Sequence, residues 1–288
     1  MPYFYLTAAV IASAASSVFG KIYNKRHAEE KGATGIYNLL LVAIFFLLWW
    51  IAYAFDYTFD KGVILYSGLF AIGFCLYNFA LIQALKYGPA SLTTLFTSMS
   101  LILTTVWGFF FWSEQPDTLI LIGLAFVILA IYFCLYSGKT DKKEFSWKWL
   151  MFSVLAMLGQ ATCAIVQRTQ QMQFDGQHGK MLMAYASLFT LVLFIGLYVA
   201  EKKSTHKMIV KKSWYLPVSA GVGNMLLNLF VMLLAVSTLP PSLIYPVLGV
   251  GGLIAVALFS LFAFKEKLKW QQWLGVAFGA IATVLLSI

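Results

Sequence analysis

Charge is what this sequence has least of. Its 288 residues include 20 Lys and Arg and 11 Asp and Glu, so charged residues make up 11% of the chain. Soluble globular proteins carry roughly 25%. Hydrophobic residues make up 61%. A large soluble helical core would need polar outer faces of helical period, and most of the apolar segments here lack them. The composition therefore argues against a soluble protein.

The few charged residues cluster, and they leave nine charge-free stretches of membrane-spanning length. About 18 or more apolar residues without charge are typical of a transmembrane helix, because about 20 residues at 1.5 Å per residue cross the hydrocarbon. The stretch 213–264 is long enough for two helices, and Leu239-Pro240-Pro241 supplies a break near its middle. We therefore predict an all-α integral membrane protein with ten transmembrane helices. The nine stretches are 1–20, 32–55, 62–85, 87–113, 118–138, 149–167, 181–200, 213–264 and 270–288.

Residues for catalysis or metal binding are also scarce. No apolar stretch carries an ionisable residue away from its ends, and the three histidines fall in predicted loops. No carboxylate pair, His/Glu cluster or nucleotide-binding glycine motif occurs, so we expect no enzyme activity, no cofactor and no metal. The three cysteines lack C-x-x-C spacing and resemble small core hydrophobes. These residues are His27, His178 and His206, and Cys75, Cys134 and Cys163.

The loops between the predicted helices differ sharply in charge. Counted from the first helix, the odd loops hold 17 of the 20 basic residues, and the even loops hold only Lys61, Arg168 and Lys180. Cytoplasmic loops are the ones enriched in Lys and Arg, so both termini are predicted to lie outside the cytoplasm in the cell membrane. The net charge of +9 is therefore a topology signal and does not indicate nucleic acid binding. Tryptophans at the span edges are predicted interfacial anchors: Trp147, Trp149, Trp214, Trp270 and Trp273.

An internal repeat divides the chain into two halves. Each half has five predicted helices, an odd number, so the second half is predicted to insert upside down relative to the first. We expect one membrane domain, 1–288, made of repeat one (1–138) and repeat two (146–288). A shift of 152 residues pairs Pro89 with Pro241, Glu114 with Glu266 and Gly123 with Gly275; a shift of 150 pairs Gly73 with Gly223 and Asn78 with Asn228.

One repeated element carries a family resemblance. It is a tight Pro turn into a Ser/Thr-rich helix, then an acidic residue at the helix end, and it occurs around Pro89 and Glu114 and again around Pro241 and Glu266. With the ten-helix plan, it resembles the drug/metabolite transporter superfamily, EamA-like branch. The resemblance implies transport of small metabolites such as amino acids, nucleotide precursors or choline. Members are often drawn with both termini in the cytoplasm, whereas the charge distribution here indicates the opposite.

Neutral polar residues inside the spans are the candidate substrate ligands. Asn and Gln amides cannot satisfy all their hydrogen bonds on the preceding helical turn, so they need helix partners, water or a ligand. They could instead only join helices, and the aromatic residues at similar depth could be a pocket wall, a cation–π box or ordinary packing. The predicted cavity residues are Ser16, Phe74, Tyr77, Asn78, Thr97, Gln160, Tyr185, Asn228 and Tyr245.

The leading hypothesis is a secondary transporter that works by alternating access. A cavity without fixed charge suits a small polar substrate that is neutral, zwitterionic or a quaternary amine. A membrane scaffold or assembly protein with the same fold is the alternative, and a channel is disfavoured because no ring of like charges is visible. The expected partners are the lipid bilayer and a small molecule, with no nucleic acid, for a monomer or homodimer. Glu114 and Glu266 are interpreted as turn or gate residues at the helix ends, or as capped and solvated loop acids.

The topology can be tested with single cysteines. A cysteine placed after Thr58 should react with an impermeant thiol reagent in intact cells, because the even loops are predicted to face outward. A cysteine placed after Lys143 should be protected. The reverse labelling pattern would show that both termini are cytoplasmic.

Overall fold

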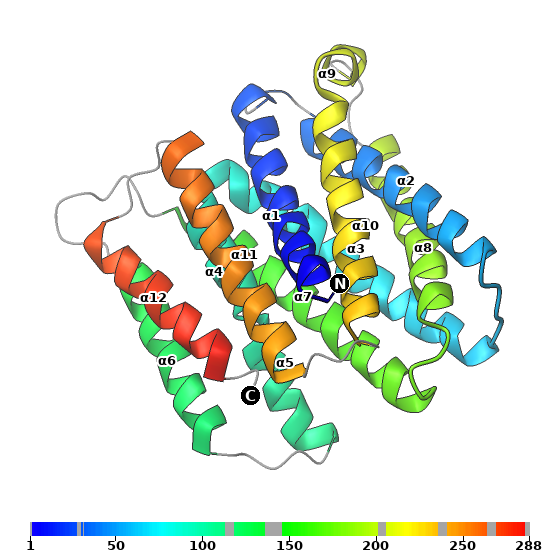
Figure 1. Cartoon of the computed structure of the whole chain (residues 1–288). Helices are drawn as coiled ribbons and strands as arrows, with labels where there is room; N and C mark the ends of the chain where they lie inside the picture. Colours follow the sequence, from blue (N-terminus) through cyan, green and yellow to red (C-terminus); the bar gives the residue numbers. More distant parts are fainter. Residues whose placement is uncertain are drawn as a thin grey trace.

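The computed structural model describes residues 2–27, 30, 32–112, 118–135, 146–200, 206–235, 241–263 and 269–285. Within these ranges the protein is all helical (Figure 1). The helices are α1 (Pro2–His27), α2 (Ala33–Ala54), α3 (Lys61–Tyr87), α4 (Ala90–Ser98), α5 (Ser100–Phe111), α6 (Thr118–Leu135), α7 (Trp147–Gln173), α8 (Gly179–Ala200), α9 (His206–Ser213), α10 (Tyr215–Ala235), α11 (Pro241–Ala263) and α12 (Trp270–Leu285).

Seven segments of the described residues are long and apolar enough to cross a membrane. They are α1, α2, α3, α7, α8, most of α10, and a joint span of α4 and α5. Shorter apolar helical segments, Leu121–Ala130 and Trp273–Ala282, lie in α6 and α12. This confirms a multi-pass membrane protein. The full count of ten spans remains a prediction.

The helix expected over 87–113 is broken in its middle at Met99, which separates α4 from α5. The hydroxyls of Thr97 and Ser98 both donate to the carbonyl oxygen of Thr94, each at 2.9 Å. Such bonds to the preceding turn are known to bend helices. The Ser/Thr-rich sequence noted above therefore accounts for a break that needs neither proline nor glycine.

In two pairs, α3 with α7 and α1 with α10, the helices approach each other closely. Small residues at the contacts make this approach possible. A Cβ on Gly159 would lie 2.5 Å from the backbone nitrogen of Tyr77 and 2.7 Å from the carbonyl oxygen of Gly73. A Cβ on Gly223 would lie 2.8 Å from the Cβ of Ala15. Backbone contact of this kind is the usual mode of helix association in membranes.

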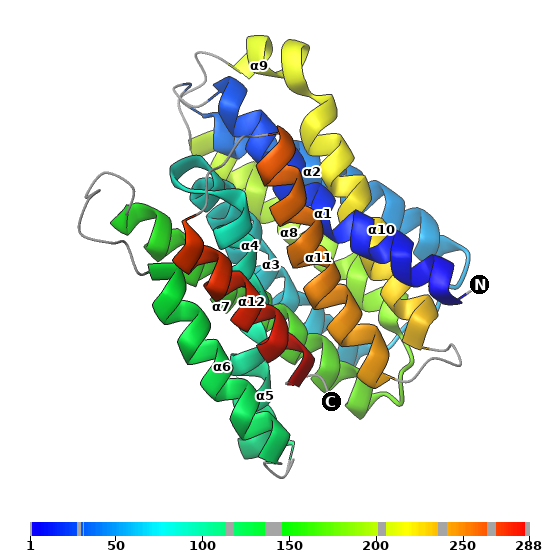
Figure 2. The ribbon, with the colours of Figure 1, turned by 60° about the vertical axis from the view of Figure 1, so that its left-hand side comes forward.

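The remaining helices form two further groups around these pairs. Helices α2 and α8 pack against each other and against α3 and α10, and their core includes Phe45, Trp49 and Phe194. On the opposite side, α6 lies along α12, as both views show (Figures 1 and 2). The short helix α9 lies at one end of the bundle, near the C-terminal end of α1.

The anchor role expected for Trp149 is wrong. Trp149 is 4% exposed, and its indole Nε1 donates to the Thr93 hydroxyl at 3.0 Å, which joins α7 to α4. Its ring lies against Gly88, where any side chain would overlap it. A tryptophan near the end of an apolar stretch can thus be a buried wedge. By contrast, Trp147, Trp214 and Trp270 are exposed, as anchors would be.

Replacing Gly88 by Ala tests this wedge. The backbone of Gly88 is extended, with φ −152°, so alanine causes no backbone strain there. Overlap with Trp149 should nevertheless lower the unfolding temperature in detergent, at a cost of about 1–3 kcal/mol. Gly68→Ala is the matched control, because no atom lies within 4 Å of its Cβ position. Equal unfolding temperatures for G88A and the parent would contradict the packing described.

Candidate functional site

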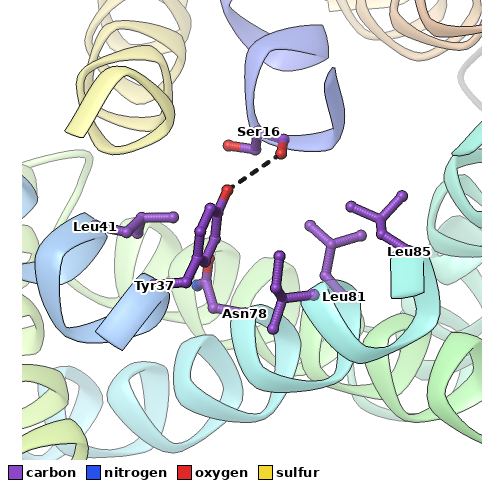
Figure 3. A pocket seen from close by; sticks show the side chains of 7 residues that line it. Ser16, Tyr37, Leu41, Asn78, Leu81 and Leu85 are labelled. Carbon is purple, nitrogen blue, oxygen red and sulfur yellow. Dashed lines mark hydrogen bonds between the residues drawn. The ribbon is translucent and has the colours of Figure 1, made fainter. Parts of the chain in front are cut away.

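A narrow gap between α1, α2 and α3 brings two of the predicted cavity residues together (Figure 3). Ser16 comes from α1 and Asn78 from α3, and Tyr37 of α2 reaches between them. The gap has no room for a water molecule. In this closed gap, the polar side chains of Ser16, Tyr37 and Asn78 lie among leucine and isoleucine side chains. Its lining residues are Ser16, Tyr37, Leu41, Asn78, Leu81, Ile82 and Leu85.

Tyr37 is a member of this site that the sequence reading missed. It is 3% exposed, and its hydroxyl donates to the carbonyl oxygen of Ser16 at 3.4 Å. The Ser16 hydroxyl in turn donates to the carbonyl oxygen of Ala220 in α10, also at 3.4 Å. These two long, weak bonds link three helices through one small residue. A tyrosine in an apolar stretch was the available signal, but 15 tyrosines in the chain dilute it.

Asn78 and Asn228, paired in the repeat, make the same local hydrogen bond. The Asn78 Nδ2 donates to the carbonyl oxygen of Phe74, and the Asn228 Nδ2 donates to that of Asn224, each at 2.8 Å. The Asn228 Nδ2 also donates to Asn224 Oδ1 at 3.2 Å, so both of its bonds stay on its own helix. The Asn78 Nδ2 has a second N–H beyond its bond to Phe74, so that amide keeps donor capacity for a further partner. Asn78 is 2% exposed, and Asn228 is half-buried.

Two predicted aromatic residues lie in packed aromatic clusters. Phe74 stacks on Phe45, with ring centroids 4.9 Å apart, and belongs to the core of α2 and α3. Tyr185 of α8 packs against Trp50 and Tyr53 of α2, at 5.6 and 6.2 Å. Neither residue lines the gap between α1, α2 and α3. Their contacts are those of packing residues.

The four remaining predicted cavity residues lie on α3, α4, α7 and α11. Thr97 donates to the carbonyl oxygen of Thr94 beside the break in α4, and Gln160 is half-buried on α7. Tyr77 is half-buried next to the close contact of α3 with α7. The side chain of Tyr245 lies outside the part of the protein that the structure describes.

Asn38 of α2 is a second buried polar residue that the sequence reading missed. It is fully buried, and neither its amide nitrogen nor its amide oxygen has a hydrogen-bond partner among the described residues. An unsatisfied amide in a membrane interior is costly. It follows Tyr37 in sequence but does not line the gap.

The expectation that His27 lies in a loop is wrong. His27 is the last residue of α1 and is 5% exposed, whereas His178 lies in the turn between α7 and α8. Among the described residues, no three His, Cys, Asp or Glu side chains gather to hold a metal ion. Cys75 and Cys163 are free thiols, and the side chain of Cys134 lies outside the described part.

Residues 1–136 match the EamA-like transporter family, which confirms the resemblance to drug/metabolite transporters over that part of the chain. Among curated proteins there is no match. Twenty-seven solved chains match in structure. One, titled only "Crystal structure of protein", has a TM-score of 0.61 and 13% identity over 97% of this chain and 97% of that one.

The family match and the apolar helices together define a class of protein. A likeness at 13% identity shows a shared fold and nothing about activity. The EamA-like match, over the first half, indicates a membrane transporter of the drug/metabolite type. The chain is a multi-pass membrane protein. The polar groups that line the gap between α1, α2 and α3 are neutral amides and hydroxyls.

The orphaned amide of Asn38 gives a stability test. Asn38→Leu removes two unsatisfied polar atoms at similar volume, so the unfolding temperature in detergent should rise, reflecting about 1–3 kcal/mol. Asn24→Leu is the control, because the Asn24 Nδ2 donates to the carbonyl oxygen of Ile82 at 2.7 Å and its loss should destabilise. A fall for both variants would show that Asn38 has a partner in the folded protein.

Proposed function

We propose that this protein is a secondary transporter for a small polar metabolite and works by alternating access. The observation that carries the proposal is the uncharged polar gap inside a chain whose first half matches a transporter family. Ser16, Tyr37 and Asn78 offer hydroxyl and amide groups and no fixed charge. A neutral, zwitterionic or quaternary amine substrate fits such groups, and a strongly anionic substrate fits poorly.

The helix contacts support a ten-helix architecture of two inverted repeats. One close contact joins Gly73 of α3 to Gly159 of α7, and the other joins Gly223 of α10 to Ala15 of α1. A sequence shift of 150 residues pairs Gly73 with Gly223. A shift of 144 pairs Ala15 with Gly159 on the α1 and α7 sides. Each close contact is therefore built from residues equivalent to those of the other, as expected if a two-fold axis relates the halves.

The closed gap supports an alternating mechanism. A site with no room for water cannot hold a metabolite, so the helices around it have to separate before substrate binds. The break at Met99 and the thin glycine-lined contacts are places where helices can bend or slide. A chain serving only as a scaffold would have no need for a second arrangement of these helices.

A metabolite panel tests the function directly. Purified protein should unfold at a higher temperature with a substrate, because a ligand at about 100 times its dissociation constant adds roughly 2.7 kcal/mol. The same compound should enter proteoliposomes that contain the protein. No stabilisation and no uptake across amino acids, nucleosides and quaternary amines would favour the scaffold alternative.

The paired asparagines test the site. Asn78→Leu and Asn228→Leu each remove a polar partner at similar volume, so substrate affinity should fall roughly 5- to 150-fold, or about 1–3 kcal/mol. Thr169→Val is the control, because it removes a hydroxyl bonded only to its own helix, at the carbonyl oxygen of Ile165, away from the gap. Normal affinity in both Leu variants would mean that the two amides only join helices.

A further inference from the structure

Three hydrogen bonds from side chain to backbone hold the C-terminal part of α1 to the end of α3. The Lys21 ammonium donates to the carbonyl oxygen of Leu85 at 3.0 Å and to that of Gly88. The Asn24 Nδ2 donates to the carbonyl oxygen of Ile82 at 2.7 Å. The last carbonyls of a helix lack partners in their own helix, and a cation is favoured beside them. We call these three bonds the α1–α3 clamp.

The α1–α3 clamp joins two helix pairs that are each held by close backbone contacts, α1 with α10 and α3 with α7. Among the described residues, the hydrogen bonds that join α1 directly to α3 are those of the clamp. The clamp also borders the gap, because a Cβ on Gly20 would lie 3.0 Å from Leu85 Cδ1 and 3.2 Å from the Tyr37 hydroxyl oxygen. The two pairs can therefore separate at this face only if the clamp breaks.

The repeat gives the α1–α3 clamp a counterpart at the opposite face of the bundle. The shift of 144 pairs Asn24 with Arg168 of α7, and the shift of 150 pairs Ile82 with Met232 of α10. A Cβ on Gly179, which begins α8, would lie 3.0 Å from the Met232 Cε. The end of α10 therefore lies at the face where α7 gives way to α8. In an inverted repeat, this is where the bonds equivalent to the clamp would form.

The counterpart residues are apart in this structure. The Arg168 guanidinium lies 4.5 Å from the centre of the Trp112 ring, just after α5, and Arg168 and Met232 share no hydrogen bond. Ile165, the counterpart of Lys21, lines a cavity of about 290 Å³ between α5 and α7. Within the described part of the chain, α1 packs against α3, whereas α7 makes no comparable contact with α10.

The two halves of the broken helix show the same difference between the faces. On the clamp side of the break at Met99, α4 packs against α1, α7, α11 and α12. On the other side, α5 packs against α7 and, as far as the structure describes them, has no comparable contact with α11. The helices are therefore drawn together at the face of the clamp and lie further apart at the opposite face.

We propose that Lys21 and Asn24 form a gate that closes the gap at the face where α1 and α3 end, and that Arg168 and Met232 form the equivalent gate at the opposite face. When the clamp breaks, the end of α7 moves against the end of α10. Arg168 then donates to the Met232 carbonyl oxygen, as Asn24 now donates to that of Ile82. The same two helix pairs carry both gates, so one closes as the other opens. The inference rests on the proposed function in taking the halves as inverted repeats that alternate.

Two spin-label distances follow the two gates without any substrate. Lys25→Cys and Lys86→Cys label exposed positions near the ends of α1 and α3, and Met172→Cys and Leu233→Cys do so near the ends of α7 and α10. Each pair is measured by double electron–electron resonance in lipid nanodiscs. In the otherwise unchanged protein, the first distance should be mainly short and the second mainly long. The native cysteines are replaced by Ala in every sample: Cys75, Cys134 and Cys163.

Lys21→Met together with Asn24→Leu removes all three bonds of the clamp. The ratio of short to long distances at the first label pair should fall about tenfold, the size expected when hydrogen bonds present in one state only are lost. The second distance should shorten in the same fraction of molecules. Lys61→Met is the matched control, because it removes an exposed cation at the start of α3, and it should change neither distance.

The second label pair separates a gate from a bond that only caps α3. Unchanged distances in K21M/N24L, or a longer first distance with an unchanged second one, would overturn the proposal. Arg168→Leu added to K21M/N24L should remove most of the short second distance, because leucine has no donor; no change there would overturn the role of Arg168. If K21M/N24L does not yield folded protein, K21M alone is judged by the same outcomes.

Failure of the proposed function would look different. Opposite changes of the two distances, with no metabolite bound or taken up, would keep the two gates and reject the proposed substrate class. Uptake of a metabolite at the parental rate in K21M/N24L, with both distances unchanged, would keep the function and reject the gates.

Discussion

Polar groups inside the apolar helices have to find hydrogen-bond partners within the protein, and that constraint shapes the structure. Hydroxyls meet it on their own helices, as Thr97 and Ser98 do at the Thr94 carbonyl, and the helix breaks there. Asn78 meets it with one donor only. Asn38 does not meet it among the described residues. A buried polar group that lacks hydrogen bonds can gain them from a ligand or in a second conformation.

The same constraint explains why backbones approach so closely. Lipid offers no hydrophobic driving force between helices, so contact has to come from packing and weak polar interactions. Gly73 against Gly159, and Gly223 against Ala15, let two helix pairs touch along their backbones. Large side chains pack beside these contacts, as the Trp149 ring does against Gly88. The polar gap lies between α1 of one such pair and α3 of the other, with α2 beside them.

Composition and spacing were enough to predict the helical membrane class, the family resemblance and two residues of one gap, Ser16 and Asn78. They were insufficient wherever the answer depended on which neighbour a side chain meets. Trp149 lies at the edge of an apolar stretch, and only the approach of α4 makes it buried. Likewise, His27 follows a charged run that reads as a loop, and its burial depends on Ser213, 186 residues away in sequence. Distance in sequence, more than chemistry, limited the prediction.

The neutral character of the gap follows from the same constraint. Charge inside a membrane span is costly, and Ser16, Tyr37 and Asn78 offer hydroxyl and amide groups without fixed charge. The bond from the Tyr37 hydroxyl to the Ser16 carbonyl oxygen and the bond from the Ser16 hydroxyl to the Ala220 carbonyl oxygen are both 3.4 Å long. Because hydrogen bonds of this length are weak, separating α1, α2 and α10 at this point costs less than breaking well-formed hydrogen bonds would.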